Sequence, residues 1–239
     1  MKEIIQNTIN SLEKFKDLKR IEFNKRTCPT AMKVIGVTVP NLTIVFKELK
    51  QQIKPFSAKE KIKIAIGLVE TGIHECQGLA YWLLGEDKDS LKFLTKKDID
   101  MLGKNLDNWG SVDSYSILLV GYAWRAGIIN TSRIKQYLSS EDYWQRRIAV
   151  VATVSLNKKA HGGTGDTKRT LEICQLAVDD HQNMVVKALS WALRELAKVD
   201  RESVVDFMKQ NKEKLHSKVI REVNNKLKFG TKNGKRQNT

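Results

Sequence analysis

Residues 144–149, with the sequence WQRRIA, have the pattern of a helix start, and two other parts of the chain resemble them. The related stretches are residues 75–80 (ECQGLA) and residues 185–189 (VVKAL). When Gly78, Arg147 and Lys187 are aligned, they lie 69 and 40 residues apart. These intervals are close to two units and one unit of a repeat of about 40 residues, a length typical of repeats that are built from helices.

A repeat of this length predicts an all-α protein of the HEAT-like solenoid type, in which antiparallel helix pairs stack around a concave face. Helical periodicity dominates the chain, and its three prolines all lie in the first quarter. Ser57 and Glu60 have the spacing of a capping box and predict the start of a helix. We expect one repeat domain over residues 1–228 and a disordered basic tail over residues 229–239, with a helical bundle as the alternative architecture.

The chain is strongly basic, with a formal net charge of +15 from 42 Lys and Arg against 27 Asp and Glu. Four of the basic residues lie in the last twelve positions, which leaves +11 on residues 1–227. An excess of this size attracts polyanions, and it favours DNA or RNA as the partner. A lysine-rich composition that serves only solubility is the alternative.

We expect neither a membrane span nor a secretory signal. The longest apolar stretch, residues 117–124, is interrupted by Gly121 and is shorter than the roughly 18 residues that a membrane helix needs. Residues 1–15 carry acidic and amide side chains where a signal peptide has an unbroken apolar core. The expected location is the cytoplasm, with the protein on the nucleoid when it is bound to DNA.

Two motifs that suggest other chemistry are incomplete. His74 and Glu75 begin like the zinc-protease motif H-E-x-x-H, but Gly78 stands where the second metal ligand is required. Residues 162–168 are similar to a phosphate loop without its G-x-x-x-x-G-K-[ST] spacing. The three cysteines are widely spaced and form no C-x-x-C pair, so we expect them to be buried apolar residues: Cys28, Cys76 and Cys174. We expect no metal site and no cofactor.

Three further motifs carry aromatic and charged side chains: residues 109–113 (WGSVD), 145–147 (QRR) and 191–198 (WALRELAK). Taken singly, a helical tryptophan is usually a core residue, and neighbouring Arg and Glu usually form a solvated face. Taken together, the order and spacing of the motifs resemble the AlkD family of alkylpurine DNA glycosylases. The resemblance extends from about residue 107 to residue 227, and residues 33–40 and 74–84 also look like parts of the family's earlier repeats.

The resemblance implies a solenoid that holds duplex DNA and hydrolyses the N-glycosidic bond of positively charged N3- or N7-alkylated purines. It implies that Asp113 is the catalytic carboxylate and that Trp109 and Trp191 are aromatic walls beside the damaged nucleotide. A single carboxylate is sufficient because a cationic base leaves without protonation, so that Asp113 has to stabilise only the oxocarbenium-like sugar and position the attacking water. The faces of the two tryptophans add to the stabilisation of that cation.

The resemblance also implies that Arg147 binds a DNA phosphate, with the adjacent Arg146 as the alternative. We expect Lys187, at the aligned position of the next repeat, to bind DNA as well. Two residues depart from the family pattern: Gly110 stands where many members have an acid, and Asn108 where some have an aromatic residue. The loop at residues 157–167 also looks longer than usual.

Two other functions are compatible with the sequence. The first is a non-catalytic HEAT-like protein that binds damaged or branched DNA, and the second is a scaffold for protein partners. The presence of Asp113 favours the enzyme over the first, because a non-catalytic relative is free to lose this residue. The basic charge disfavours the second. We expect the enzyme to act as a monomer, without lyase activity.

Overall fold

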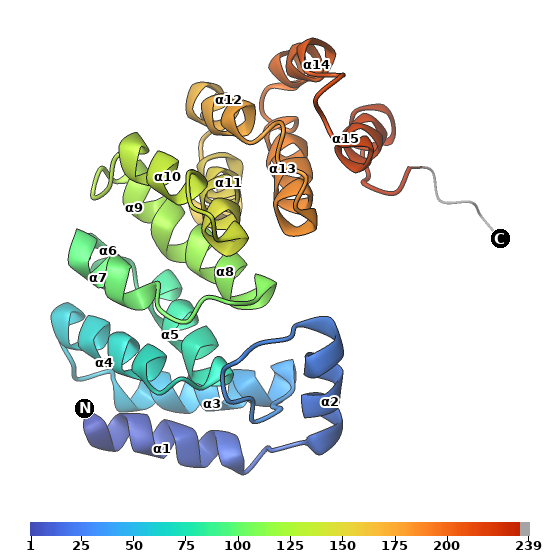
Figure 1. The fold of residues 1–239 in the computed structure, drawn as a ribbon. Coiled ribbons are helices and arrows are strands. Elements are labelled where there is room, and N and C mark those ends of the chain that lie inside the picture. The colour runs from blue at the N-terminus through green and yellow to red at the C-terminus, as the bar shows by residue number, and fades with distance from the viewer. Residues whose placement is uncertain (235–239) are drawn as a thin grey trace. The chain divides into compact units, whose positions relative to one another are not determined.

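The computed structural model of the chain describes residues 1–234. Within this range the backbone is helical, and β-type pairing is limited to an isolated bridge between Lys33 and Ile73. The prediction of an all-α fold of stacked helices is confirmed (Figure 1). None of the helices in the described part is both long and apolar enough to cross a lipid bilayer.

The helices belong to two compact units, one formed by Met1–Leu119 and the other beginning at Val120. The first unit contains α1 (Lys2–Glu13), α2 (Leu18–Thr27), α3 (Val39–Gln52), α4 (Ala58–Glu70), α5 (His74–Glu86), α6 (Lys88–Lys92), α7 (Lys96–Leu102) and α8 (Trp109–Tyr115). The second unit contains α9 (Gly121–Arg125), α10 (Thr131–Leu138), α11 (Tyr143–Asn157), the 3-10 turn η2 (Lys159–His161), α12 (Thr167–Leu176), α13 (Asn183–Leu196), α14 (Arg201–Gln210) and α15 (Ser217–Phe229). The division between the units falls inside η1 (Ser116–Val120), a π-helical segment. The expectation of one repeat domain over residues 1–228 stays a prediction.

α5 is the central helix of the first unit, and it contacts α3, α4 and α8. Its side chains Cys76, Leu79 and Tyr81 are fully buried. The hydroxyl of Tyr81 donates a hydrogen bond to the carbonyl oxygen of Leu102 at 2.8 Å, so the phenol is satisfied inside the core. α4, which packs against α5, begins with the predicted capping box, since Ser57 and Glu60 each bond to the backbone N–H of the other.

Glu75 has a structural role in this unit. It is 4% exposed, and its carboxylate accepts hydrogen bonds from the backbone N–H groups of Ile35, Gly36 and Val37 at 2.7 to 3.3 Å. Three such donors compensate the burial of a negative charge. The residue that looks like the glutamate of a zinc-protease motif therefore fixes the segment between α2 and α3. Residues 1–234 contain no cluster of three or more His, Cys, Asp or Glu that has the arrangement of a metal site.

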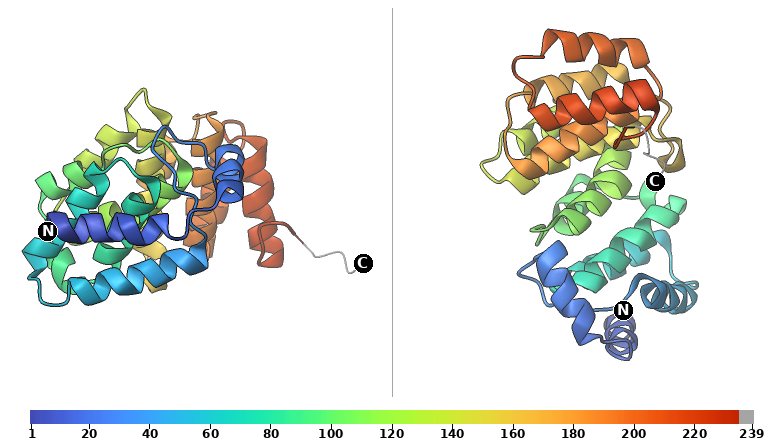
Figure 2. Two further views of the ribbon diagram at one scale, coloured as in Figure 1. Left: turned by 90° about the horizontal axis from the view of Figure 1, so that it is seen from below. Right: turned by 90° about the vertical axis from the view of Figure 1, so that its right-hand side faces the viewer.

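The second unit is built from stacked helix pairs. α11, α13 and α15 lie side by side, and α10, α12 and α14 form a second layer against them (Figures 1 and 2). α11 is buried from Arg147 to its last residue. The fifth residues of α5, α11 and α13 are the three that the sequence repeat aligned, Gly78, Arg147 and Lys187. The repeat in the sequence therefore corresponds to equivalent positions in three helices of the fold.

The glycine-rich segment after α11 is a closely packed turn. A Cβ atom on Gly163 would lie 2.5 Å from the carbonyl oxygen of Ser155, and Gly165 adopts a φ of +100° that favours glycine. Asn157 closes the segment by accepting a hydrogen bond from the backbone N–H of Asp166 at 3.0 Å. These glycines allow the backbone to pass close to the end of α11. Close packing therefore explains why this segment, which is similar to a phosphate loop, is rich in glycine.

The three cysteines are free and buried, as predicted: Cys28, Cys76 and Cys174. Burial raises the pKa of Cys76 and of Cys174 to about 12, which makes both thiols unreactive near neutral pH. The expected start of the tail at residue 229 falls on the last residue of α15, and residues 231–233 continue as a turn. The rest of the expected tail, residues 235–239, lies outside the described residues.

Candidate active site and DNA interface

The first candidate residues lie at the start of α8 in the first unit. Asn108 is the N-cap of this helix, and its side-chain oxygen accepts a hydrogen bond from the backbone N–H of Ser111 at 3.0 Å. Because Asn108 provides the cap, Ser111 and Asp113 are not needed for it. Asp113 is the fifth residue of α8, one turn after Trp109, and it is half-buried. Residues four apart lie on the same face of a helix, so Trp109 and Asp113 share one face.

Trp109 is held by the last residue of α2, next to the loop that follows this helix. Its indole N–H donates a hydrogen bond to the carbonyl oxygen of Thr27 at 2.8 Å, while the residue remains 42% exposed. Exposure of this extent is unusual for a tryptophan whose N–H is already bonded inside the protein. The hydrogen bond fixes the orientation of the ring, and part of the side chain remains exposed to solvent.

Asp107 anchors the same loop. Its carboxylate accepts hydrogen bonds from the hydroxyl of Thr30 and the backbone N–H of Ala31, both at 2.6 Å. Burial alone would raise the pKa of Asp107, but the hydrogen bonds from Thr30, Ala31 and Asn108 outweigh it and hold the pKa below its ordinary value. Asp107 is therefore ionised near neutral pH. We refer to the contacts of residues 27–31 with residues 107–109 as the α2–α8 clamp.

Cys28 completes the α2–α8 clamp. Its thiol donates a hydrogen bond to the side-chain oxygen of Asn108 at 3.2 Å. Burial is the largest cause that raises the pKa of Cys28, and the negative charges of Asp107 and Asp113 add to it. A Cβ atom on Gly110 would lie 3.4 Å from the Cys28 sulfur and 3.3 Å from the Asn108 oxygen. Asn108 and Gly110, the two residues that depart from the family pattern, therefore both lie against Cys28.

The adjacent arginines of α11, in the second unit, have different surroundings. Arg146 forms an ion pair with Asp180 at 2.6 Å and donates to the carbonyl oxygens of Ser140 and Glu141 at 2.9 and 2.8 Å. Its guanidinium group thereby ties the loop before α11 to the loop before α13. Arg147 is 5% exposed and donates to the carbonyl oxygen of Met184, at the start of α13.

Lys187 and Trp191 lie one turn apart on α13 and are both half-buried. The pKa of Lys187 is lowered, first by burial and then by the positive charges of Lys218, Arg147 and Lys232. Several cations therefore gather around this turn of α13. Trp109 and Asp113 belong to the first unit, whereas Arg147, Lys187 and Trp191 belong to the second.

Two features near these residues could not be recognised in the sequence. The role of Asp107 depends on partners 76 and 77 positions earlier in the chain, and no local pattern indicates such contacts. The positions of Lys218 and Lys232 beside Lys187 depend on the packing of α15 against α13. The signal that was available is the position of Asp107 directly before the cap of a helix that carries a candidate catalytic residue.

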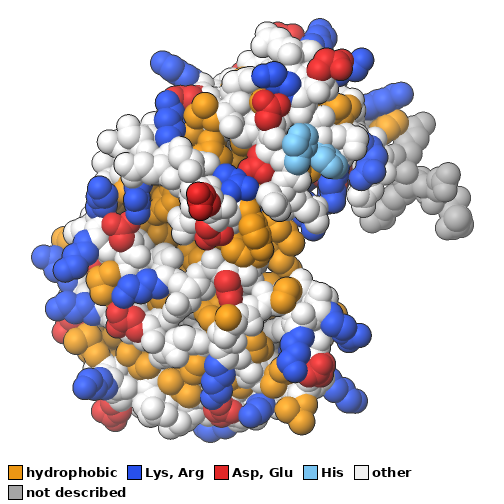
Figure 3. Space-filling model, in the orientation of Figure 1, with side chains coloured by type: hydrophobic (Ala, Val, Ile, Leu, Met, Phe, Trp, Pro, Cys, Tyr) orange, Lys and Arg blue, Asp and Glu red, His pale blue; other side chains and the backbone are white. Residues whose placement is uncertain are grey.

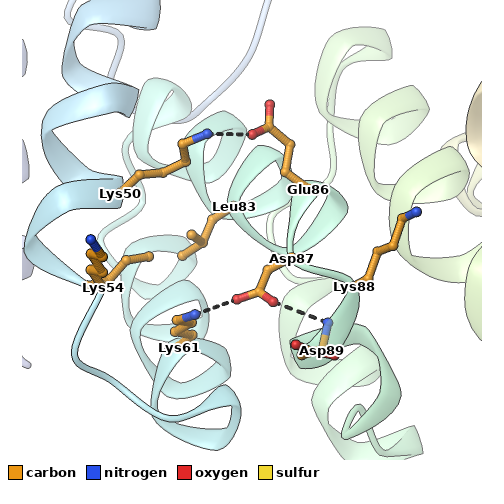
Figure 4. A pocket seen from close by; sticks show the side chains of 9 residues that line it. Lys50, Lys54, Lys61, Leu83, Glu86, Asp87, Lys88 and Asp89 are labelled. Carbon is orange, nitrogen blue, oxygen red and sulfur yellow. Dashed lines mark hydrogen bonds and ion pairs between the residues drawn. The ribbon is translucent and has the colours of Figure 1, made fainter.

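An open hollow of about 490 Å³ in the first unit contains none of the predicted site residues (Figure 4). Its lining comes from α3, α4, α5 and α6 with their flanking residues. Two ion pairs lie at its rim, between Lys50 and Glu86 and between Lys61 and Asp87, both at 2.8 Å. Elsewhere on the face that Figure 3 shows, basic side chains are spread over both units and acidic side chains lie among them.

Comparison with known proteins identifies the family. Residues 8–227 match the model of the DNA alkylation repair enzyme family, so the chain belongs to this family. Its fold is similar to a solved structure described as a predicted DNA alkylation repair enzyme from Enterococcus faecalis. The TM-score is 0.68 at 15% sequence identity, over 90% of this chain and 97% of the other. No curated protein matches the chain. The resemblance to DNA alkylation repair proteins in the sequence is thereby confirmed, and the family implies DNA as the substrate.

Proposed function

We propose that the chain is a monofunctional DNA glycosylase that hydrolyses the N-glycosidic bond of positively charged N3- or N7-alkylated purines in duplex DNA. The observation that carries the proposal is the start of α8, where a carboxylate follows a fixed but exposed indole by one helical turn. Membership of a family of DNA alkylation repair enzymes supports the same conclusion.

This reaction does not require the protein to protonate the leaving purine base. An N3- or N7-alkylated purine carries a positive charge in its bound state, so it can depart as a neutral base without a general acid. The remaining difficulty is the positive charge that develops on the sugar, and a fixed negative charge lowers the energy of that transition state. Asp113 supplies this charge and orients the water that attacks the sugar carbon.

The aromatic residues and the cations have separate roles in this proposal. Trp109 and Trp191 present their faces to the cationic nucleotide. Arg147 and Lys187 bind phosphates and position the DNA backbone. Arg146, which forms an ion pair with Asp180 at 2.6 Å, remains the alternative for phosphate binding.

A base-release assay tests the proposal. The wild-type protein is incubated with a duplex that carries a single N7-methylguanine, and the free base and the abasic site are both measured. The proposal expects equal amounts of free base and abasic site, with no strand cleavage until the abasic site is treated with alkali. Tight binding to the duplex without release of the base would indicate instead a DNA-binding protein without catalytic activity.

A further inference from the structure

The C-terminal helix of the second unit faces the turn of α13 that carries Lys187. Lys187, Ser190 and Arg194 follow one another at intervals of three and four residues, so they lie on one face of α13. α15 packs along α13 (Figure 2), and its residues Lys218 and Glu222 are likewise four apart. Glu222 connects these faces of α13 and α15 through a hydrogen bond with Ser190.

Glu222 is a buried carboxylate, with 4% of the residue exposed. It accepts a hydrogen bond from the hydroxyl of Ser190 at 2.6 Å, and the ammonium group of Lys232 lies 3.5 Å from its other oxygen. The hydroxyl of Ser190 in turn accepts a hydrogen bond from Arg194 at 3.2 Å. A buried carboxylate requires such partners, and here they come from both α13 and the residues after α15.

The turn after α15 carries Lys232 back to this helix. α15 ends at Phe229 and is capped by Gly230, which has a φ of +74°. The side-chain amide of Asn225 donates to the carbonyl oxygen of Lys232 at 3.1 Å, and Lys226 donates to the carbonyl oxygen of Gly230 at 2.7 Å. These bonds hold the turn against the helix. The turn also lies beyond residues 8–227, the part that matches the family model.

The resulting charges do not balance. Lys187, Lys218 and Lys232 bring three positive charges together, and Glu222 supplies the negative charge that opposes the other two at Lys187. Like charges that are brought together on a folded protein repel one another, and an anion relieves the repulsion. The side chain of Lys232 is 47% exposed, so an anion from solution can reach its ammonium group.

We propose that Lys187, Lys218 and Lys232 form a phosphate-binding cluster that contacts the backbone of duplex DNA and is organised by Glu222. The choice of DNA as the anion rests on the proposed function, whereas the cluster itself rests on the contacts of α13, α15 and the turn. Its ligand is a phosphodiester of the DNA backbone, so its contribution does not depend on base sequence or on damage.

The test measures binding to an undamaged duplex of about two helical turns as the salt concentration changes. Lys218→Gln and Lys232→Gln each remove one positive charge, and so does the control, Lys168→Gln, whose exposed side chain lies on α12 outside the cluster. Each lost phosphate contact reduces the slope of log K against log salt by about 0.9. Between about 50 and 200 mM salt, wild-type affinity should therefore fall about 3.5-fold more than that of each single variant, and about 12-fold more than that of the double variant.

The control should keep the wild-type slope. The proposed cluster would be wrong if Lys218→Gln and Lys232→Gln kept the wild-type slope of log K against log salt. It would also be wrong if Lys168→Gln reduced this slope by the same amount as they do. The assay uses undamaged DNA and requires no base release, so the cluster can fail while the wild-type protein releases N7-methylguanine. Conversely, a protein without glycosylase activity can still give the expected slopes.

Discussion

Asp107 shows how one residue can support a site without taking part in its chemistry. It is ionised, and it holds the loop after α2 through two bonds of 2.6 Å. That loop directly follows Thr27, the last residue of α2, whose carbonyl group orients Trp109. A local motif in the sequence indicated Trp109 and Asp113 as candidate site residues. The sequence could not indicate a role for Asp107, because its hydrogen-bond partners Thr30 and Ala31 lie far from it along the chain.

Asp107→Asn tests this role through the pH dependence of stability. The folded-state pKa of Asp107 is lowered, so its contribution is present above the unfolded-state pKa and is lost as the pH falls through the folded-state value. At pH 7 the variant should lose about 1 kcal/mol of unfolding free energy, a value reduced for the partial exposure of the carboxylate. Urea titrations should show this difference at pH 7 and a much smaller one near pH 3. A difference of the same size at both pH values would contradict the assignment.

The two arginines of α11 should respond differently to substitution. Arg146→Ala leaves Asp180 without its ion-pair partner, so we expect a loss of about 3 kcal/mol in stability and an unchanged salt dependence of DNA binding. Arg147→Ala should weaken DNA binding for all sequences and reduce the salt slope by about 0.9. Thermal unfolding and fluorescence anisotropy distinguish these effects. The opposite pattern would assign phosphate binding to Arg146.

At the scale of single elements, the sequence predicted the helices better than the turns. The capping box of α4 and the alignment of Gly78, Arg147 and Lys187 were both correct, because caps and repeats depend on local spacing. The glycine-rich segment after α11 could be recognised only as a loop. Its close approach to Ser155 depends on how the chain packs, and composition does not reveal that.

Two glycine substitutions test this distinction. Gly163→Ala should destabilise the protein by about 2 kcal/mol or more, because its Cβ atom would meet the backbone of Ser155 and Leu156 at 2.5 to 2.7 Å. Gly78→Ala, in the middle of α5 with open space around it, should stabilise the protein by about 0.5 to 1 kcal/mol. Chemical denaturation of both variants measures the effects. Equal stabilities would contradict the close packing of the turn.

At the scale of the whole molecule, the high positive charge of the sequence indicated a nucleic acid as the partner, and membership of a DNA repair family explains this charge. A net charge of +15 suits a protein that binds DNA, and the match to the DNA alkylation repair enzyme family over residues 8–227 gives that charge a function. The sequence could not indicate which lysines are brought together, since the charge of Lys232 acts on Lys187 only because α15 packs against α13.

The proposed mechanism also predicts which bases are removed. His74, whose charge interacts with Asp107, has a pKa that burial lowers, so it is neutral and unsuited to protonating a leaving base near pH 7. Duplexes that contain N7-methylguanine or N3-methyladenine should therefore be processed, while uracil and hypoxanthine should persist under single-turnover conditions. Efficient release of either neutral base would require a general acid that the proposal lacks.

The catalytic role of Asp113 is tested by comparing single-turnover release of N7-methylguanine by the wild-type protein, Asp113→Asn and the control Asp206→Asn. Asp206 is an exposed carboxylate on α14, so its substitution makes the same chemical change away from α8. We predict that Asp113→Asn lowers the rate by about 100-fold or more and leaves duplex affinity nearly unchanged, because the lost charge acts mainly on the transition state. The control should retain the wild-type rate. A wild-type rate for Asp113→Asn would show that this carboxylate is not the catalytic group.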